Sequence, residues 1–277
     1  MKEKELFKWG EFKEYLNELE GQYGPFHSTK NPALFRGHAS SKWNLSTTLE
    51  RYSDRVWSVT EYLKLTNDCK AKIESLSGRS WILPGEEDAI ASIETSDLFR
   101  LNLPHENYGY WTYLRHNGFP SPLLDWSASP YIAALFAFHE SYQVKDDSRV
   151  AIFIFIEKPT GGKAFAGGRP RIHVKGQYVR SHTRHYLQQA HYTVCTQDRG
   201  SGLITFVPHT ESLKITAKQP LQNEQDVLVK VTLPAKERIT VLEDLQKMNI
   251  NLYSLMNTEE ALVKSIAYWE IDQNYRE

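Results

Sequence analysis

The chain has 277 residues, of which 40% are hydrophobic and 24% are charged. This composition is typical of globular proteins and excludes disorder as the main state. The 33 lysine and arginine residues nearly balance the 34 acidic residues, so binding of duplex nucleic acid through bulk positive charge is not expected, although a local basic groove remains compatible. The two cysteines, Cys69 and Cys195, exclude a disulfide framework and a cysteine-rich zinc site.

The N-terminal segment MKEKELFKWGEF has neither the apolar core nor the small-residue cleavage site of a secretory signal. The sequence also contains no run of about 18 apolar residues, which a membrane-spanning helix requires. The low cysteine content suits a reducing compartment. We therefore expect a cytoplasmic protein without a membrane partner.

Helices are predicted for most of the first half of the chain. Apolar residues recur at three- and four-residue steps from Trp9 to Tyr23 and indicate one helical face. The predicted elements that follow are a strand over 33–36, a helix from Ser53 or Asp54 to about Ile73, and helices over 88–100 and 108–116 with Gly118 as a C-terminal cap.

Strands become more frequent in the second half. The predicted elements are an extended segment over 119–127, a helix that begins at Ser129-Pro130, a buried strand over 150–156, a short helix over 181–189, strands over 191–195 and 227–231, a helix from Ile239, and a last helix capped by Asn257 and Glu260. No repeat or linker divides the chain, so we expect a single α+β domain over 1–277, with an N-terminal helix in 1–30 and a core in 31–277.

The usual sequence signatures of enzymes are absent: the chain has no GxGxxG, GxxxxGK[ST], HExxH or GxSxG. His182, His185 and His191 lie close together in the sequence, but no carboxylate accompanies them at the spacing of metal ligands. We therefore predict no metal site.

Arg36 follows Ala-Leu-Phe at the end of a predicted buried strand, and Gly37 comes next. A planar cation in such a place needs an acidic partner or an anionic ligand, because an unpaired buried charge is costly. Glycine allows another backbone or a ligand to approach closely. Two interpretations remain open: an anion site at Arg36, or a structural ion pair, for example with Asp125.

The segment Leu123-Leu-Asp-Trp-Ser127 places an acid, an indole and a hydroxyl in a row. In a strand, Asp125 and Ser127 share one face while Trp126 takes the other. An acid and a hydroxyl on one wall suit the binding of a ribose. The alternative is that Asp125 caps a turn and Trp126 fills the core. His116 upstream and Gln189 before the strand at 191–195 are further polar candidates.

Taken in chain order, these pieces resemble the FRG domain family, which is named for a Phe/Tyr-Arg-Gly signature. The resemblance is carried by LFRGH at 34–38, KWNLS at 42–46, Glu50-Arg51, LRHNGFPSPLLDWS at 114–127 and RHYLQQAHY at 184–192. The GFPSPLLDWS block is its specific part. The chain departs from the family pattern at Asn117, at Ser121-Pro122 and at Ala190-His191.

FRG domains are in turn similar in layout to ADP-ribosyltransferases of the arginine–serine–glutamate type. The resemblance implies a split mixed β-sheet core surrounded by helices, with NAD as co-substrate. It maps Arg36 onto the arginine that holds NAD, Ser127 or Asp125 onto the hydroxyl region, and Gln189 near the place of the glutamate. FRG proteins are associated with toxin and phage-defence loci, which implies an effector role and an antitoxin protein as a partner.

In such a site, Arg36 and Gly37 would bind the pyrophosphate, Ser127 or Asp125 would orient the ribose, and Tyr192 or Trp126 would stack on a ring. His116 completes the set of predicted cofactor-binding residues, and Arg36, Asp125 and Gln189 are the predicted catalytic residues. Gln189 supplies no charge to the developing oxocarbenium ion. Asp125 or Glu157 would have to supply it, and the sequence does not distinguish between them.

The predicted function is therefore NAD-dependent ADP-ribosyl transfer to a macromolecular acceptor, either RNA or protein. An RNA acceptor requires a basic patch, for which the sequence offers the interleaved residues Arg169, Arg171, His173, Lys175, Tyr178, Arg180, His182 and Arg184. A solvated loop is the alternative interpretation of that run. Two other functions stay open: a non-catalytic nucleotide- or partner-binding module, and a nuclease or glycohydrolase centred on His116 and Asp125.

Overall fold

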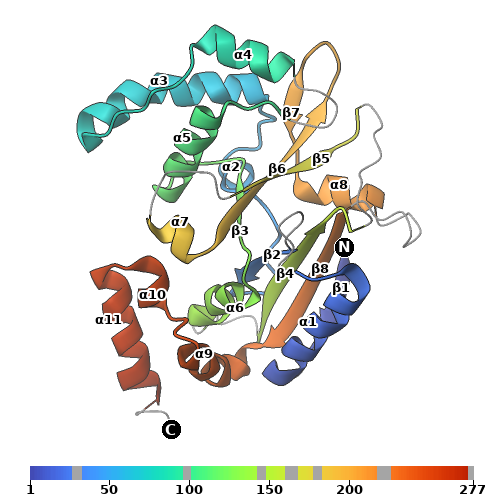
Figure 1. Ribbon diagram of the computed structural model, residues 1–277, viewed down its shortest axis with the longest axis vertical. Helices are drawn as coiled ribbons and strands as arrows, with labels where there is room; N and C mark the ends of the chain where they lie inside the picture. Colours follow the sequence, from blue (N-terminus) through green and yellow to red (C-terminus); the bar gives the residue numbers. More distant parts are fainter. Residues whose placement is uncertain are drawn as a thin grey trace.

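The computed structural model describes residues 1–26, 33–95, 101–141, 148–159, 168–176, 183–216 and 226–273. These residues form one eight-stranded mixed sheet with helices packed around it, an α+β fold (Figure 1). The strands are β1 (Lys2–Glu5), β2 (Ala33–His38), β3 (Leu124–Ser127), β4 (Arg149–Glu157), β5 (Arg171–Lys175), β6 (Ala190–Asp198), β7 (Ile204–Phe206) and β8 (Asp226–Pro234).

The helices fall between these strands and after the last of them. They are α1 (Trp9–Tyr23), α2 (Thr48–Tyr52), α3 (Val59–Ser77), α4 (Glu86–Glu94), α5 (His105–His116), α6 (Pro130–His139), α7 (Thr183–Leu187), α8 (His209–Thr216), α9 (Arg238–Lys247), α10 (Leu252–Met256) and α11 (Glu259–Ala267), followed by a π-helical turn over Tyr268–Gln273. Within this part of the chain, no helix has both the length and the apolar character needed to cross a bilayer.

The sheet has the strand order β1-β8-β4-β2-β3-β6-β5, and β7 pairs with the outer part of β6. The β1–β8 pair is parallel, and the other pairs are antiparallel. A single residue pair, Phe35 with Ser127, joins β2 to β3. This is the shortest pairing among the strands of the described sheet, and we call this place the split of the sheet. An ADP-ribosyltransferase-like core stays a prediction.

Helices α1, α6 and α9 cover one face of the half formed by β8, β4 and β2. Alternate residues of these strands, such as Phe35, Ile154 and Val229, pack against them in one apolar cluster. Helix α6 begins where the sequence predicts it to begin, because Ser129 Oγ accepts a hydrogen bond from the Ile132 amide and Pro130 occupies the first turn.

Helices α3, α4 and α5 pack against the other half of the sheet, where Ala190, Tyr192 and Val194 of β6 face them. A third apolar cluster lies on the sheet face opposite α6 and includes Leu34, Trp126, Phe153 and Cys195. Because Leu34 and Arg36 are two residues apart on β2, the Arg36 side chain leaves the strand on the face of this third cluster.

Two predicted helix boundaries are wrong, for a common reason. Helix α3 begins after Ser58, which forms a capping box with Glu61, and Ser53 instead ends the short α2. The last helix is capped by Thr258, whereas Asn257 adopts a left-handed conformation (φ 50°) and ends α10. In both places the sequence offers several good capping residues within a few positions, and packing selects one of them. The short elements β1, β5, β7, α2, α8 and α10 were not predicted.

Candidate functional site

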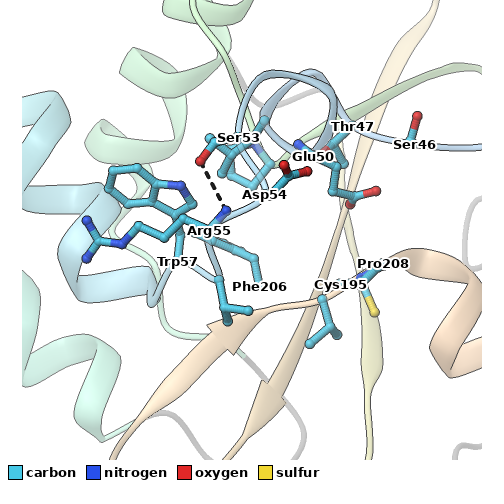
Figure 2. A pocket seen from close by; sticks show the side chains of 14 residues that line it. Ser46, Thr47, Glu50, Ser53, Asp54, Arg55, Trp57, Cys195, Phe206 and Pro208 are labelled. Atoms are coloured by element: carbon cyan, nitrogen blue, oxygen red, sulfur yellow. Dashed lines mark hydrogen bonds between the residues drawn. The ribbon is translucent and has the colours of Figure 1, made fainter.

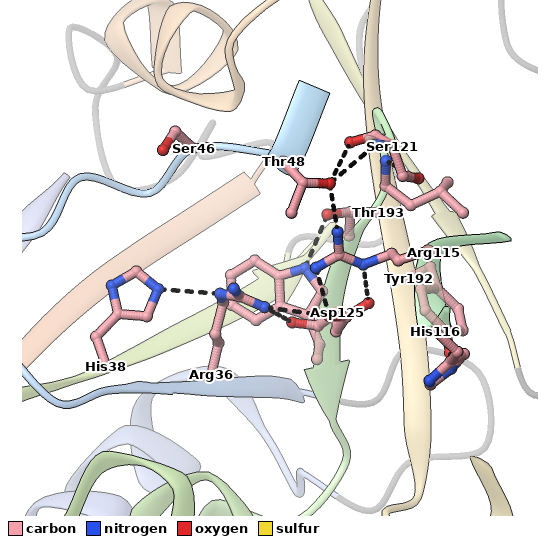
Figure 3. A network of polar contacts seen from close by, with 12 residues as sticks. Arg36, His38, Ser46, Thr48, Arg115, His116, Ser121, Asp125, Tyr192 and Thr193 are labelled. Carbon is pink, nitrogen blue, oxygen red and sulfur yellow. Dashed lines mark hydrogen bonds and ion pairs between the residues drawn. The ribbon is translucent and has the colours of Figure 1, made fainter. Parts of the chain in front are cut away.

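The candidate site lies between β2 and β3, which share a single residue pair, and the Arg36 side chain extends from β2 to β3 (Figure 3). Its Nη1 donates a hydrogen bond of 2.7 Å to the carbonyl oxygen of Asp125 on β3. Its Nε donates one of 3.0 Å to Nε2 of His38, two residues further along β2. Because arginine has only donors, His38 accepts this bond and is a neutral imidazole with its proton on Nδ1.

Two arginines share the Asp125 carboxylate. Arg115, in the last turn of α5, binds both carboxylate oxygens through Nε and Nη2, and Nη1 of Arg36 lies 3.8 Å from Oδ2. Arg115 is held from its other side by Thr48, whose hydroxyl accepts a hydrogen bond of 2.9 Å from Nη1. Thr48 also accepts one of 2.8 Å from the amide of Ser121. This network thus connects α2, α5, β2 and β3.

The pKa values follow from this geometry. Burial alone would raise the pKa of Asp125, but the charge and hydrogen bonds of Arg115, together with Arg36, hold it below its ordinary value. Burial lowers the pKa of Arg36 to about 10, with partial compensation by Asp125. Both arginines and Asp125 are therefore charged at neutral pH. Two cations facing one carboxylate leave a net positive charge at the split.

One nitrogen of the Arg36 guanidinium is not engaged by the described residues. Its side chain is 17% exposed, and its Nη2 makes no hydrogen bond to any of the residues that the structure describes. The structural partner that the sequence suggested for Arg36, Asp125, is confirmed. Because the pairing with Asp125 uses Nη1 and leaves Nη2 without a partner in the described residues, the ion pair and an anion site do not exclude each other.

Gly37 does not face the site. A Cβ atom on Gly37 would overlap the carbonyl oxygen of Ala133 and lie 2.6 Å from the amide nitrogen of Ala137, both in α6. The sequence left open whether a backbone or a ligand lies close to Gly37. In the structure, the backbone of α6 lies there. The prediction that Gly37 contacts a cofactor is therefore not supported by its position.

Ser127 ends β3, and its hydroxyl is already engaged. Its Oγ donates a hydrogen bond of 2.8 Å to the carbonyl oxygen of Gln188 and accepts one of 3.0 Å from the amide of Ser129. These two bonds connect β3, the start of α6 and the turn before β6. Ser127 is 5% exposed. It therefore positions the turn that carries Gln189.

Gln189 lies at the next strand of the sheet, because its carbonyl accepts a hydrogen bond of 3.0 Å from Ala128. The residue has a left-handed conformation (φ 47°) and is exposed. Its side chain makes no hydrogen bond to the described residues. Arg36, Ser127 and Gln189 thus lie on β2, at the end of β3 and directly before β6. That they form one site stays a prediction.

Trp126 and Tyr192 do not fit the predicted role of stacking on a ligand ring. Trp126 is 4% exposed, and its indole nitrogen donates a hydrogen bond of 2.8 Å to Thr193. Tyr192 has no exposed surface, stacks on His185 and lies with its hydroxyl 2.6 Å from Nε2 of His116. Both rings are core residues, and His116 is exposed at the end of α5, where it contacts Tyr192.

Glu157, the alternative source of negative charge, lies outside this site. It is four residues along β4 from Phe153, the partner of Arg36 across the sheet, which is about 13 Å at the rise of a strand. Its carboxylate is near Lys158. Asp125 is therefore the carboxylate at Arg36, and Arg115 neutralises most of its charge.

Three residues of the site were missed from the sequence: His38, Thr48 and Arg115. Arg115 directly precedes His116 in the segment that carries the family resemblance, and a cation in the last turn of a helix is a common arrangement. The sequence contains no signal that this cation meets Asp125, since α5 and β3 are joined by a turn whose path is set by packing.

Members of the predicted RNA-binding patch lie on two elements of the described structure. Arg171, His173 and Lys175 belong to β5, whereas Arg184 belongs to α7 and donates to the carbonyl of Met256. Strand β5 pairs with β6 from Thr196 to Tyr192, and α7 directly precedes β6 in the chain. Three members of the predicted patch, Tyr178, Arg180 and His182, lie outside the described residues.

Two buried histidines make stability depend on pH. Burial lowers the pKa values of His38 and His209 to about 3 each, whereas an unfolded chain binds these protons near pH 6.5. Between about pH 3 and pH 6.5 the unfolded state binds more protons than the folded state. The contribution of the two neutral histidines to stability is therefore complete above about pH 6.5 and decreases as the pH falls below it. The expected slope is about 1.4 kcal/mol per pH unit for each histidine.

We expect His209→Gln to remove about half of this slope in urea unfolding measured between pH 6.5 and 4.5. His105→Gln, a change at an exposed histidine at the start of α5, serves as the control and should leave the slope unchanged. An identical slope in His209→Gln and the parent would contradict the assignment of His209 as a neutral buried group.

Comparison with known proteins gives one match. Residues 31–146 match the family model of the FRG domain. The match covers somewhat less than half of the chain and includes Arg36, Arg115, Asp125 and Ser127, but ends before Gln189. No curated protein matches the chain, and no solved structure matches it.

Proposed function

Residues 31–146 form an FRG domain, and from this premise we propose that the protein is an NAD-dependent ADP-ribosyltransferase. One observation carries the proposal: a partly exposed arginine with unused donors lies at the split of the sheet, next to strands that bring Ser127 and Gln189. The surplus positive charge of Arg36 and Arg115 over Asp125 suits a pyrophosphate.

In the proposed reaction, the bond between the nicotinamide nitrogen and the ribose C1′ breaks, and nicotinamide leaves with the electron pair. A nucleophile of the acceptor attacks C1′ and loses its proton. Arg36 holds the pyrophosphate through Nη2, while Nη1 stays bound to Asp125. The amide oxygen of Gln189 accepts a hydrogen bond from the ribose 2′-hydroxyl, and Ser127 fixes the turn on which Gln189 lies.

The acceptor is proposed to be a macromolecule, RNA or protein, and the protein to act as a cytoplasmic toxin or phage-defence effector that an antitoxin restrains. The resemblance of the sequence to FRG proteins supports this proposal. Induced expression in bacterial cells is expected to arrest growth, and Arg36→Ala is expected to relieve the arrest at equal protein level.

The first test of the proposal removes the guanidinium. Arg36→Ala is expected to lower transfer of label from adenylate-labelled NAD to cell extract by about 100-fold or more, since the charged donor that holds and orients the pyrophosphate is lost. Loss of the bond to the Asp125 carbonyl should lower stability by only about 1–2 kcal/mol. Label transfer and urea unfolding are measured on the same samples.

Arg36→Lys and Arg79→Ala are the matched variants. Lysine keeps the charge but not the planar pair of donors, so partial activity is expected. Arg79 is an exposed arginine near the ring of Tyr113, and Arg79→Ala should keep full activity. If activity in Arg36→Ala falls only in proportion to the folded fraction, then Arg36 is a structural residue and the proposal fails.

A second candidate function is a non-catalytic module that binds a nucleotide. The specific observation in its favour is that the only carboxylate beside Arg36 in the described part of the site is already bound by Arg115. In this case NAD raises the melting temperature, the increase is lost in Arg36→Ala, and neither nicotinamide nor labelled acceptor is formed.

A further inference from the structure

A cavity of about 390 Å³ that Arg36 does not line lies between the segment that contains α2 and the strands β6 and β7 (Figure 2). Its volume is within the range of about 300–1,000 Å³ that is typical of small-molecule sites. Its apolar lining is formed by Leu49, Val56, Trp57, Phe206, Val207 and Pro208. Segments 46–57 and 195–208 supply most of the wall, and Figure 2 shows them on opposite sides of the opening.

Two carboxylates, Glu50 and Asp54, line this cavity. Neither forms an ion pair with the residues that the structure describes. The one arginine in the lining, Arg55, is committed elsewhere: it pairs with Glu61, and its guanidinium lies 4.4 Å from the centre of the Trp57 ring. The cavity therefore has a negative wall that no lining cation neutralises.

Arg51, next to Glu50 in the chain, forms no ion pair with Glu50. Its Nη1 donates a hydrogen bond of 2.7 Å to the carbonyl oxygen of Ser46. Burial raises the pKa of Glu50 above its ordinary value, and hydrogen bonds to Thr47 and the charge of Arg51 offset this only in part. An ionised Glu50 beside an apolar wall is thus only partly compensated, and a bound cation would supply further compensating charge.

We propose that this cavity binds a planar organic cation, which donates hydrogen bonds to Glu50 while its flat apolar part packs against Phe206 and the neighbouring apolar lining. Aromatic walls bind such cations through both apolar contact and the negative face of the ring. An anion is disfavoured by Glu50 and Asp54, and a neutral isostere lacks the charge interaction. This site is distinct from the proposed NAD site, since it shares none of its residues.

The test uses the full-length protein and three probes of the same shape: benzamidine as the cation, benzamide as the neutral isostere and benzoate as the anion. Calorimetric titration up to about 10 mM is expected to detect benzamidine, with benzamide and benzoate at least about tenfold weaker. Glu50→Gln keeps the shape of the side chain and should weaken benzamidine by about tenfold or more. Asp54→Asn should weaken it less, because Asp54 is more exposed.

Glu259→Gln, at an exposed glutamate at the start of α11, is the control and should bind benzamidine as the parent does. A melting curve for each variant shows that it is folded. The proposal is overturned if benzamidine does not bind, if benzamide binds equally well, or if Glu50→Gln leaves its affinity unchanged. None of these results depends on NAD or on transferase activity, so the proposed function can fail without affecting this test.

Discussion

Replacing Gly37 by alanine is expected to destabilise the protein by about 3 kcal/mol or more, at the upper end of what overpacking of a core costs. The added Cβ would meet the carbonyl oxygen of Ala133 and the amide nitrogen of Ala137. These are backbone atoms of α6, so no side chain can rotate to make room. Either α6 separates from β2, or the strand shifts beside Arg36.

Urea unfolding at neutral pH measures this effect. Gly21→Ala is the matched control: Gly21 lies in α1, and nothing is within 4 Å of the position of its Cβ. There the same substitution should be neutral or stabilising by up to about 1 kcal/mol, because alanine favours the helix. A loss of less than about 1 kcal/mol in Gly37→Ala would contradict the close packing of α6 on β2.

Gln189→Glu is expected to increase transferase activity by about 10- to 100-fold, if the proposed function holds. The Gln189 side chain is exposed and has no partner in the described residues, so the change should not affect the fold. A carboxylate at this position would place a negative charge beside the developing oxocarbenium ion. Asp125 supplies little of that charge, because Arg115 binds both of its oxygens.

The measurement is the initial rate of nicotinamide release together with label transfer from NAD. Gln188→Glu is the control at the adjacent position: the Gln188 amide lies 3.4 Å from the Leu255 carbonyl and 3.3 Å from Met256 Sδ, directed toward α10. That variant should not gain activity. If Gln189→Glu is as inactive as the parent while NAD still raises the melting temperature of both, the non-catalytic module is the better account.

Local sequence patterns were sufficient for the longer elements. The apolar spacing from Trp9 to Tyr23 predicts α1 with its observed bounds, and the β-branched and aromatic run at 150–156 predicts the central strand β4. Each pattern works because it reflects the period of one element and the face that it buries. Short elements such as β7 and α10 lack enough residues to show a period, and only their tertiary neighbours stabilise them.

For the candidate site, the sequence indicated Arg36 and Asp125 as partners, but it did not reveal Arg115 as the second cation. Nor did it show that Trp126 and Tyr192 are enclosed in the core. An aromatic residue has the same sequence signature whether it lines a pocket or fills a core. The difference depends on which helix lies over it, which is a property of packing.

The sequence by itself determined the α+β class, the FRG signature around Arg36 and the order in which Arg36, Ser127 and Gln189 occur along the chain. Only the tertiary structure decided that β2 and β3 meet at a single residue pair, that Arg36 hydrogen-bonds the backbone of Asp125 across these strands and that Arg115 neutralises Asp125. The physical reason is that charge balance and burial are set by neighbours far apart in sequence, which local periodicity does not encode.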